Sequence, residues 1–347
     1  GVLNLDKLEL TSEALRSRTA GRIESPGENA QVNLDGQVSY DLQKVGALLR
    51  PYFGHGVQMA GRNTSQLQVR GPLDVAALQA ETSLRWAGAD LYGFLVGPGQ
   101  LRMQLADGVL QTDPLDVTVS DGRLTLAPRM RLSPGPVELE LEPGPLAQQV
   151  HITPRMCAGA LQYIAPILAG VASAEGTFSL EMDGCRIPIA DPARGELAGR
   201  FVVHSVSVGP GPLIRELALV LGRAAPATLA QESVVQFRMV DGRVYHQGLE
   251  LVFPEITVRT HGSVGLDQSL AMVAEMPVPA HWAGTHPLGL ALRDQTIRLP
   301  IAGTLQKPKI DRRVLDIYSQ QFLRRATKNL IQEHLGKQLD RLLPPPK

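Results

Sequence analysis

The sequence has no excess of positive charge and few aromatic residues. Its 347 residues include 34 Lys and Arg against 34 Asp and Glu, and aromatic residues make up 4% of the chain. Nucleic-acid binding needs a basic surface and, for single strands, aromatic rings on which bases can stack. The composition therefore argues against nucleic acid as a partner.

Long apolar runs and catalytic motifs are also missing. The chain has no stretch of about 18 consecutive apolar residues, the length that predicts a transmembrane helix. The glycine-rich stretches at 96–100 and 208–214 lack the spacing of a phosphate-binding loop, and HWAGTHP has no acidic residue between its histidines. We therefore expect neither an enzyme nor a bound cofactor or metal.

The cysteines are few. Cys157 and Cys185 are the two in the chain, and without clustered histidines they offer too few ligands for a zinc site. They could form a disulfide, as in proteins of an oxidising compartment, or remain two free thiols in the core.

What the sequence does contain is repeated alternation of apolar and polar residues. In EITVRTHGSVGL, for example, Ile256, Val258, Val264 and Leu266 fall on one side of an extended chain. A period of two predicts a strand with one apolar face. Similar segments, separated by turns such as ADG, SDG, EPGP and VDG, predict a mainly β protein built around a long, twisted antiparallel sheet.

Four segments break the alternation and predict helices. They are residues 41–54, 152–171, 211–222 and 311–343. The second is apolar nearly all round, and Pro166 should kink or split it. The last is basic and amphipathic. We expect it to be a docking or regulatory element that packs on its own β core, on a membrane surface or on another envelope protein.

The chain also contains an internal repeat. Residues 107–132 lie on residues 241–266 without a gap when the sequence is shifted by 134 positions, with the DG turn and the apolar phase both kept. This predicts two related β modules, at 1–150 and 176–310, joined by an apolar helical segment at 151–175 and followed by the helix at 311–343.

The apolar stripes allow two interpretations. Two facing sheets could bury them in a sandwich core, or one curved sheet could leave them open as a groove that holds lipid chains. Composition does not separate these alternatives. On the groove interpretation, the residues expected to face lipid are Leu115, Val117, Val119, Leu249, Leu251, Phe253, Ile256, Val258, Val264 and Leu266.

Residues 241–311 resemble the AsmA-like family. The similarity lies in the DG turn, in the strands that lead to HGSVGLD and in the ending LPIAGTLQKPKID. Gly262, Ser263 and Val264 match one step of the family pattern, and Gly303, Thr304 and Leu305 match the ending. The chain departs from the family at Gly265, where an acidic residue is common.

The resemblance implies a function. AsmA-like proteins are similar to the bridge-like lipid-transfer proteins, which have a hydrophobic β-groove, and they take part in phospholipid traffic and outer-membrane biogenesis. The expected partner is a phospholipid or another acyl lipid. The expected location is the periplasm or envelope, with an inner-membrane anchor in an N-terminal segment that this sequence does not include.

Two functions of other classes remain open. The chain could be a structural or assembly factor for outer-membrane or envelope proteins that carries no lipid. It could also be an extracellular adhesion module with a β-sandwich fold.

Overall fold

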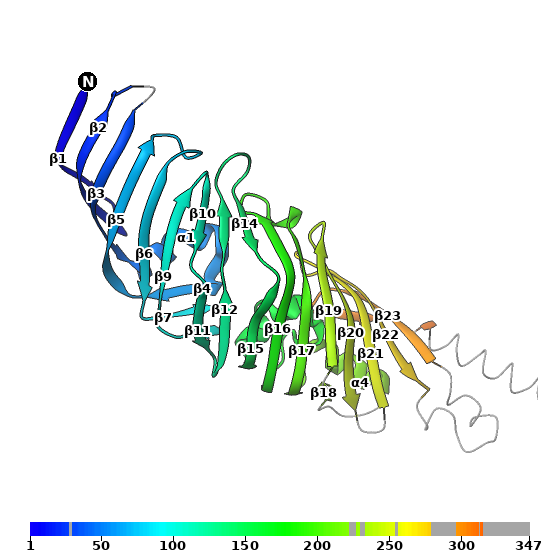
Figure 1. The fold of residues 1–347 in the computed structure, drawn as a ribbon. Helices are drawn as coiled ribbons and strands as arrows, with labels where there is room; N and C mark the ends of the chain where they lie inside the picture. Colours follow the sequence, from blue (N-terminus) through cyan, green and yellow to red (C-terminus); the bar gives the residue numbers. More distant parts are fainter. Residues whose placement is uncertain are drawn as a thin grey trace, which may run out of the picture.

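A computed structural model of the protein describes residues 1–27, 30–221, 227–229, 233–253, 256–278, 296–311 and 313–314. These residues form one large antiparallel sheet, in which each strand pairs with neighbours that are mostly consecutive in the chain. Figure 1 shows the sheet as a long twisted ribbon, with the N-terminus at one end and β23 at the other. The prediction of a mainly β protein with a long antiparallel sheet is confirmed.

The first part of the sheet is built from fourteen of the described strands. They are β1 (Val2–Thr11), β2 (Leu15–Glu24), β3 (Gln31–Asp41), β4 (Val57–Ala60), β5 (Arg62–Pro72), β6 (Gln79–Trp86), β7 (Gly88–Leu91), β8 (Phe94–Val96), β9 (Gly99–Ala106), β10 (Val109–Thr112), β11 (Leu115–Val119), β12 (Gly122–Leu126), β13 (Arg129–Arg131) and β14 (Glu138–Leu141).

The second part continues the same ladder. Its strands are β15 (Gly144–His151), β16 (Ala174–Pro188), β17 (Glu196–Val208), β18 (Ala227–Leu229), β19 (Ser233–Val240), β20 (Arg243–Phe253), β21 (Ile256–Gly265), β22 (Leu270–Pro277), β23 (Thr296–Gly303) and β24 (Pro308–Ile310).

The sheet branches where its two parts meet. The fifteen-residue strand β16 pairs along one end with β14 and along the other with β15. One branch therefore runs through β9, β10, β13 and β14, and the other runs through β8, β11, β12 and β15. Long strand β16 is the element that joins them.

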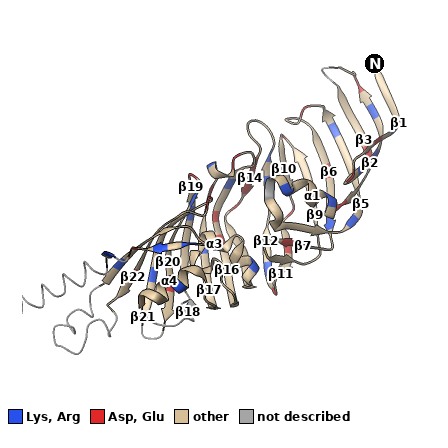
Figure 2. Cartoon of the chain, turned by 180° about the vertical axis from the view of Figure 1, so that it is seen from behind, with Lys and Arg blue, Asp and Glu red and all other residues tan. Residues whose placement is uncertain are grey.

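Short helices lie between the strands. They are α1 (Leu42–Phe53), α2 (Pro154–Ala158), α3 (Leu161–Ile164), α4 (Pro212–Leu221) and the 3-10 helices η1 (Gly54–Gly56), η2 (Pro166–Leu168) and η3 (Pro192–Arg194). Asp41 caps α1, because its carboxylate accepts a hydrogen bond from the Gln43 amide. Seen from behind in Figure 2, α3 and α4 lie in front of the strands of the second part.

Two helix predictions need correction or stay open. The segment 152–171 forms three short pieces: Pro166 splits it, as expected, by opening η2, and a further break that was not expected comes where Gly159 ends α2. The helix predicted at 311–343 lies outside the described residues, apart from residues 311, 313 and 314. No helix among the described residues is long and apolar enough to cross a membrane.

Candidate functional site: an apolar face with an open and a covered region

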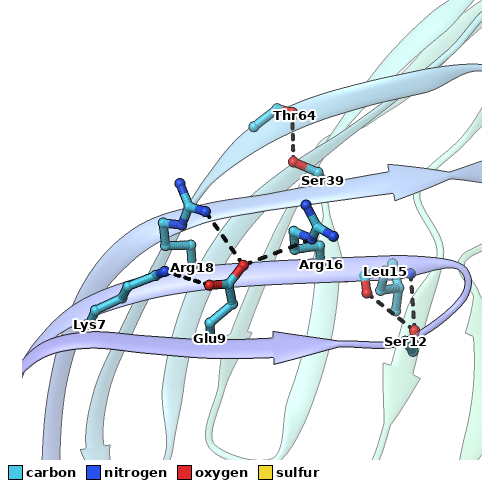
Figure 3. Close-up of polar contacts among 8 residues, drawn as sticks. All are labelled: Lys7, Glu9, Ser12, Leu15, Arg16, Arg18, Ser39 and Thr64. Carbon is cyan, nitrogen blue, oxygen red and sulfur yellow. Dashed lines mark hydrogen bonds and ion pairs between the residues drawn. The ribbon is translucent and has the colours of Figure 1, made fainter.

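The two faces of the sheet differ in chemistry. Along the first strands, one face carries ion pairs and hydroxyl hydrogen bonds, which Figure 3 shows around Glu9. The Glu9 carboxylate lies 2.6 Å from the Lys7 ammonium, and a hydrogen bond of 2.8 Å joins the Ser39 and Thr64 hydroxyls. The opposite face, which we call the apolar face, is lined by the alternate residues of the same strands.

A row of directly paired residues runs across the apolar face at right angles to the strands. Each member is the cross-strand partner of the next, so all lie on one face of the sheet. The row, which we call the apolar row, consists of Leu5, Gly21, Leu34, Val69, Ala80, Leu105, Leu110, Met130, Leu139 and Ile187.

The apolar row is long and open to solvent. It crosses ten strands, and at about 4.8 Å between strands it extends for about 43 Å. Leu34 is buried, Gly21 is exposed, and the other eight members are half-buried. At the far edge, on β1, Leu3 and Leu10 are 48% and 63% exposed. Leucines on a sheet face that only packs inward would be more deeply buried.

The hydrophobic core lies elsewhere in the sheet. Among the described residues, its large connected cluster includes none from β1, β2, β3, β5, β9, β10, β13 or β14, although Val32, Leu34 and Tyr40 of β3 are buried outside it. We call these eight strands, with β6, the open region. The core is formed by β8, β11, β15–β17 and β19–β24 together with α2, α3, η2 and α4, and Leu124 of β12 packs against it; we call all of these elements the covered region.

Helices close the apolar face of the covered region. Leu213, Ile214 and Leu217 of α4 are buried, as are Met156 and Leu161 of α2 and α3. They share one core with the strands beneath. The rings of Phe178 and Phe201, on β16 and β17, lie 5.0 Å apart between their centroids. This part of the face is therefore a packed interior rather than an open surface.

An ion pair connects α2, in the covered region, to β7 in the first part of the sheet. A guanidinium nitrogen of Arg155, on α2, lies 2.7 Å from a carboxylate oxygen of Asp90, on β7. Gly93 sits in the turn between β7 and β8 so close to the Met156 amide that a side chain would collide with it. The start of α2 is thus held directly against the first part of the sheet.

The residues predicted to face lipid mostly lie in the covered region. Val117, Val119, Leu249, Leu251, Phe253, Ile256, Val258 and Val264 are buried members of one core, and Leu115 packs against it. Within each strand they share one face, because they alternate along β11 and β20, and β21 pairs Val258 with Leu251 and Ile256 with Phe253. In this structure their contacts are with protein.

Leu266, the last of the residues predicted to face lipid, lies just beyond the end of its strand. Strand β21 ends at Gly265, and Leu266 lies in the following turn with 38% of its surface exposed. Its amide donates to the Gly242 carbonyl. The alternation in the sequence continues one step beyond the strand, so the pattern alone could not show where the chain turns.

Sequence reasoning did not single out the members of the apolar row. Alternation predicted several of their strands, such as those at 31–40 and 101–105, but not β2, β6 or β10. Two residues of the row, Gly21 and Ala80, are small and reduce the contrast between the faces. The signal that links them is the pairing of strands distant in sequence, such as β3 with β5 and β6 with β9. That pairing cannot be read from one strand at a time.

Two cross-strand pairs recur 134 positions later in the chain. Leu110 pairs with Met130, and the residues 134 positions later, Val244 and Val264, pair in the same way. Val117 likewise pairs with Leu124, as Leu251 does with Val258. The two DG turns at 107–108 and 241–242 also share the left-handed conformation.

Both cysteines are free, so the disulfide that the sequence allowed is not formed. Cys157 is buried on α2, whereas Cys185 is half-buried on β16. Burial raises the pKa of the Cys157 thiol to about 12 and that of Cys185 to about 11. Cys185 pairs with Leu141 and Leu197 on the apolar face, beside the end of the apolar row.

The segment HGSVGLDQS forms a compact polar turn. The Arg243 guanidinium donates hydrogen bonds to the Ser263 and Ser269 hydroxyls at 3.0 and 2.8 Å. Hydrogen bonds from Ser269 lower the pKa of the Asp267 carboxyl. A side chain at Gly265 would displace that carboxylate and the Ser269 hydroxyl. These hydrogen bonds hold the turn after β21 together.

No group of three or more His, Cys, Asp or Glu side chains in the described parts of the chain is placed to hold a metal ion. The comparisons with known proteins add no relative. No protein family, no curated protein and no solved structure matches the chain.

Proposed function

We propose that the protein is a non-enzymatic lipid-binding or lipid-transport protein, in which acyl chains lie along the apolar row. The observation that carries this proposal is the exposure of the row. Eight of its ten members are half-buried, and none of those on β1–β14 belongs to the described hydrophobic core.

Physical chemistry supports an acyl chain as the ligand. An exposed apolar strip that is both long and narrow matches the shape of a hydrocarbon chain better than that of a globular ligand. Each methylene group that leaves water contributes about 0.8 kcal/mol. Binding along the row then needs no specific polar contact. The length of the row, about 43 Å, exceeds the thickness of the hydrocarbon core of a bilayer, which is about 30 Å.

The family resemblance at 241–311 leads to the rest of the proposal. It supports a location in the periplasm or envelope of a diderm bacterium and a role in outer-membrane biogenesis. We also propose that the sheet consists of two related β modules that form one groove. The register shared by residues 134 positions apart supports this division.

The test compares two substitutions on neighbouring residues of β10. Leu110 points to the apolar face, whereas Gln111, the next residue, points to the polar face and is exposed. Leu110→Glu and Gln111→Glu add the same charge at almost the same place. Each variant and the wild type would be mixed with a phospholipid that carries a photoactivatable group on its acyl chain, then irradiated.

We expect cross-linking to fall at least tenfold in Leu110→Glu and to stay unchanged in Gln111→Glu, because a carboxylate in the row must be desolvated when lipid binds. Peptide mapping should locate the adducts on strands of the open region. Equal cross-linking of both variants would refute the row as the binding site. Absence of cross-linking in the wild type would favour an assembly factor without lipid cargo.

A further inference from the structure

One histidine in the covered region has no polar partner. His246, on β20, has 3% of its surface exposed. Neither of its ring nitrogens has a hydrogen-bond partner among the described residues. Buried polar side-chain atoms in proteins are nearly always hydrogen-bonded, so an imidazole with both nitrogens unpaired is a costly feature.

The strands around His246 are weakened at the same place. His246 is paired with Gly262 of β21, which offers no side chain to pack against the ring. The register shifts between His246 and Leu249, where Gly248 adopts a left-handed conformation. The hydroxyl of Thr260, also on β21, is a second buried polar group that has no hydrogen-bond partner in the described structure. Two unpaired polar groups thus flank an interruption of the β20–β21 ladder.

No residue paired directly with His246 carries a negative charge that could balance a protonated ring. The directly paired neighbours on the apolar face, Phe237 and Gly262, cannot ionise. The titratable groups on the elements packed against His246 are Tyr163 on α3, Arg238 on β19, Arg243, Tyr245 and Glu250 on β20, Arg259 and His261 on β21, and Glu275 on β22.

The two carboxylates in this set are already paired. Glu250 lies 2.8 Å from Arg259, and Glu275 lies 2.9 Å from Arg298. By alternation along their strands, these side chains lie on the polar face, opposite to His246. His261 acts on His246 as a charge of the same sign. A proton on His246 would therefore remain uncompensated while the strands stay closed.

We propose that His246 is a proton-sensitive switch: its protonation separates β20 from β21 and uncovers the apolar face of the covered region. The switch does not depend on lipid: it determines when the face sealed by the helices becomes accessible.

The direction of the pH effect follows from burial. Desolvation, with a contribution from His261, lowers the pKa of His246 from 6.5 to about 4. The closed state therefore holds the neutral ring, and the open state takes up the proton more readily. The contribution of His246 to closure is complete above about pH 6.5 and is lost progressively as the pH falls towards 4.

A native thiol reports the opening. Cys157 is fully buried in the core to which the neighbours of His246, Val244 and Leu249, also belong. In a Cys185→Ser background, the rate at which Cys157 reacts with 4,4′-dithiodipyridine, a reagent that works in acid, would be measured from pH 7 to pH 4.5. Each rate would be divided by the rate of the urea-unfolded chain at the same pH.

Between pH 7 and pH 5 we expect the normalised rate to rise about twentyfold, as the uptake of one proton by the open state requires. In His246→Leu and in His246→Gln the rise should disappear. His204 provides a matched control, because it is half-buried but has a hydrogen bond of 2.8 Å with Ser179. His204→Gln should keep the rise.

Two results would overturn the proposal. One is a wild-type rate that changes less than twofold between pH 7 and pH 5. The other is a rise that persists in both His246 variants. Circular dichroism at pH 7 would establish that each variant is folded. Because no lipid is present, the outcome does not depend on the proposed lipid function.

Discussion

The open and covered regions are made from the same kind of strand, yet they differ in what lies on the apolar face. In the open region Leu10 and Leu15 are 63% and 47% exposed, whereas in the covered region Leu249 and Leu251 are fully buried. The difference comes from the short helices α2, α3 and α4, which cover one region and not the other. An alternating strand therefore does not determine whether its apolar side becomes a core or a surface.

The largest effect that this comparison predicts is on stability. Leu251→Ala should lower the free energy of unfolding by about 2–5 kcal/mol, because it leaves a cavity in a packed core. Leu105→Ala, in the half-buried apolar row, should cost about 1 kcal/mol. Urea denaturation followed by circular dichroism would measure both. Equal losses would mean that the two regions are packed alike.

Two glycines offer a smaller and more local comparison. Gly176 in the covered region and Gly21 in the open region both have a positive φ, and a side chain at either would collide with a backbone carbonyl of the adjacent strand. Gly176→Ala should cost about 2–3 kcal/mol. We expect Gly21→Ala to cost less, because β1 and β2 lie at the edge of the sheet and can shift.

Thermal denaturation of the two alanine variants shows directly which of them loses more stability. Gly184→Ala is the matched control, since Gly184 also has a positive φ but has open space around its Cβ position. A larger loss for Gly21→Ala than for Gly176→Ala would contradict the assignment of the edge strands as the more adaptable part.

The two cysteines allow a comparison without any substitution. N-ethylmaleimide at pH 8 should label Cys185 about tenfold faster than Cys157, because Cys185 is half-buried beside the apolar row and Cys157 is enclosed. Both should react more slowly than in the unfolded chain, since burial raises both pKa values. Mass spectrometry of the labelled peptides distinguishes the two sites. Similar rates at both would contradict the boundary drawn between the regions.

The smallest effect is expected on the polar face. The pKa of Glu9 is lowered by its hydrogen bond and ion pair with Lys7, so its charged form stabilises the fold above the ordinary carboxyl pKa and loses this contribution as the pH falls. The group is exposed, and such pairs contribute little. Glu9→Gln should therefore leave the melting temperature unchanged within error at pH 7. A clear loss would show that ion pairs support the open region.

Much of the fold could be predicted from the sequence, because strands and tight turns leave local signals. The alternation around Val258 and the turn at Asp241 and Gly242 are examples. The division into open and covered regions could not be predicted in this way. It depends on where three short helices pack, and their apolar residues give no indication of which strands they contact.

The candidate site was predicted only in part. The apolar face was expected, but the residues chosen to line it, such as Leu249 and Phe253, are the ones that the helices bury. Strong hydrophobicity made them conspicuous in the sequence. For the same reason they form the core. The more open row contains smaller residues, such as Ala80 and Gly21, and is recognised only when distant strands are paired.

The direction of the apolar row has a consequence for how such a molecule can change in length. Since the row crosses the strands, its length depends on how many strands there are and not on how long each one is. Duplication or deletion of one hairpin would change it by about 10 Å and leave the existing strand pairs intact. The number of hairpins that the gene encodes would thus set the length of the apolar row, in steps of one hairpin.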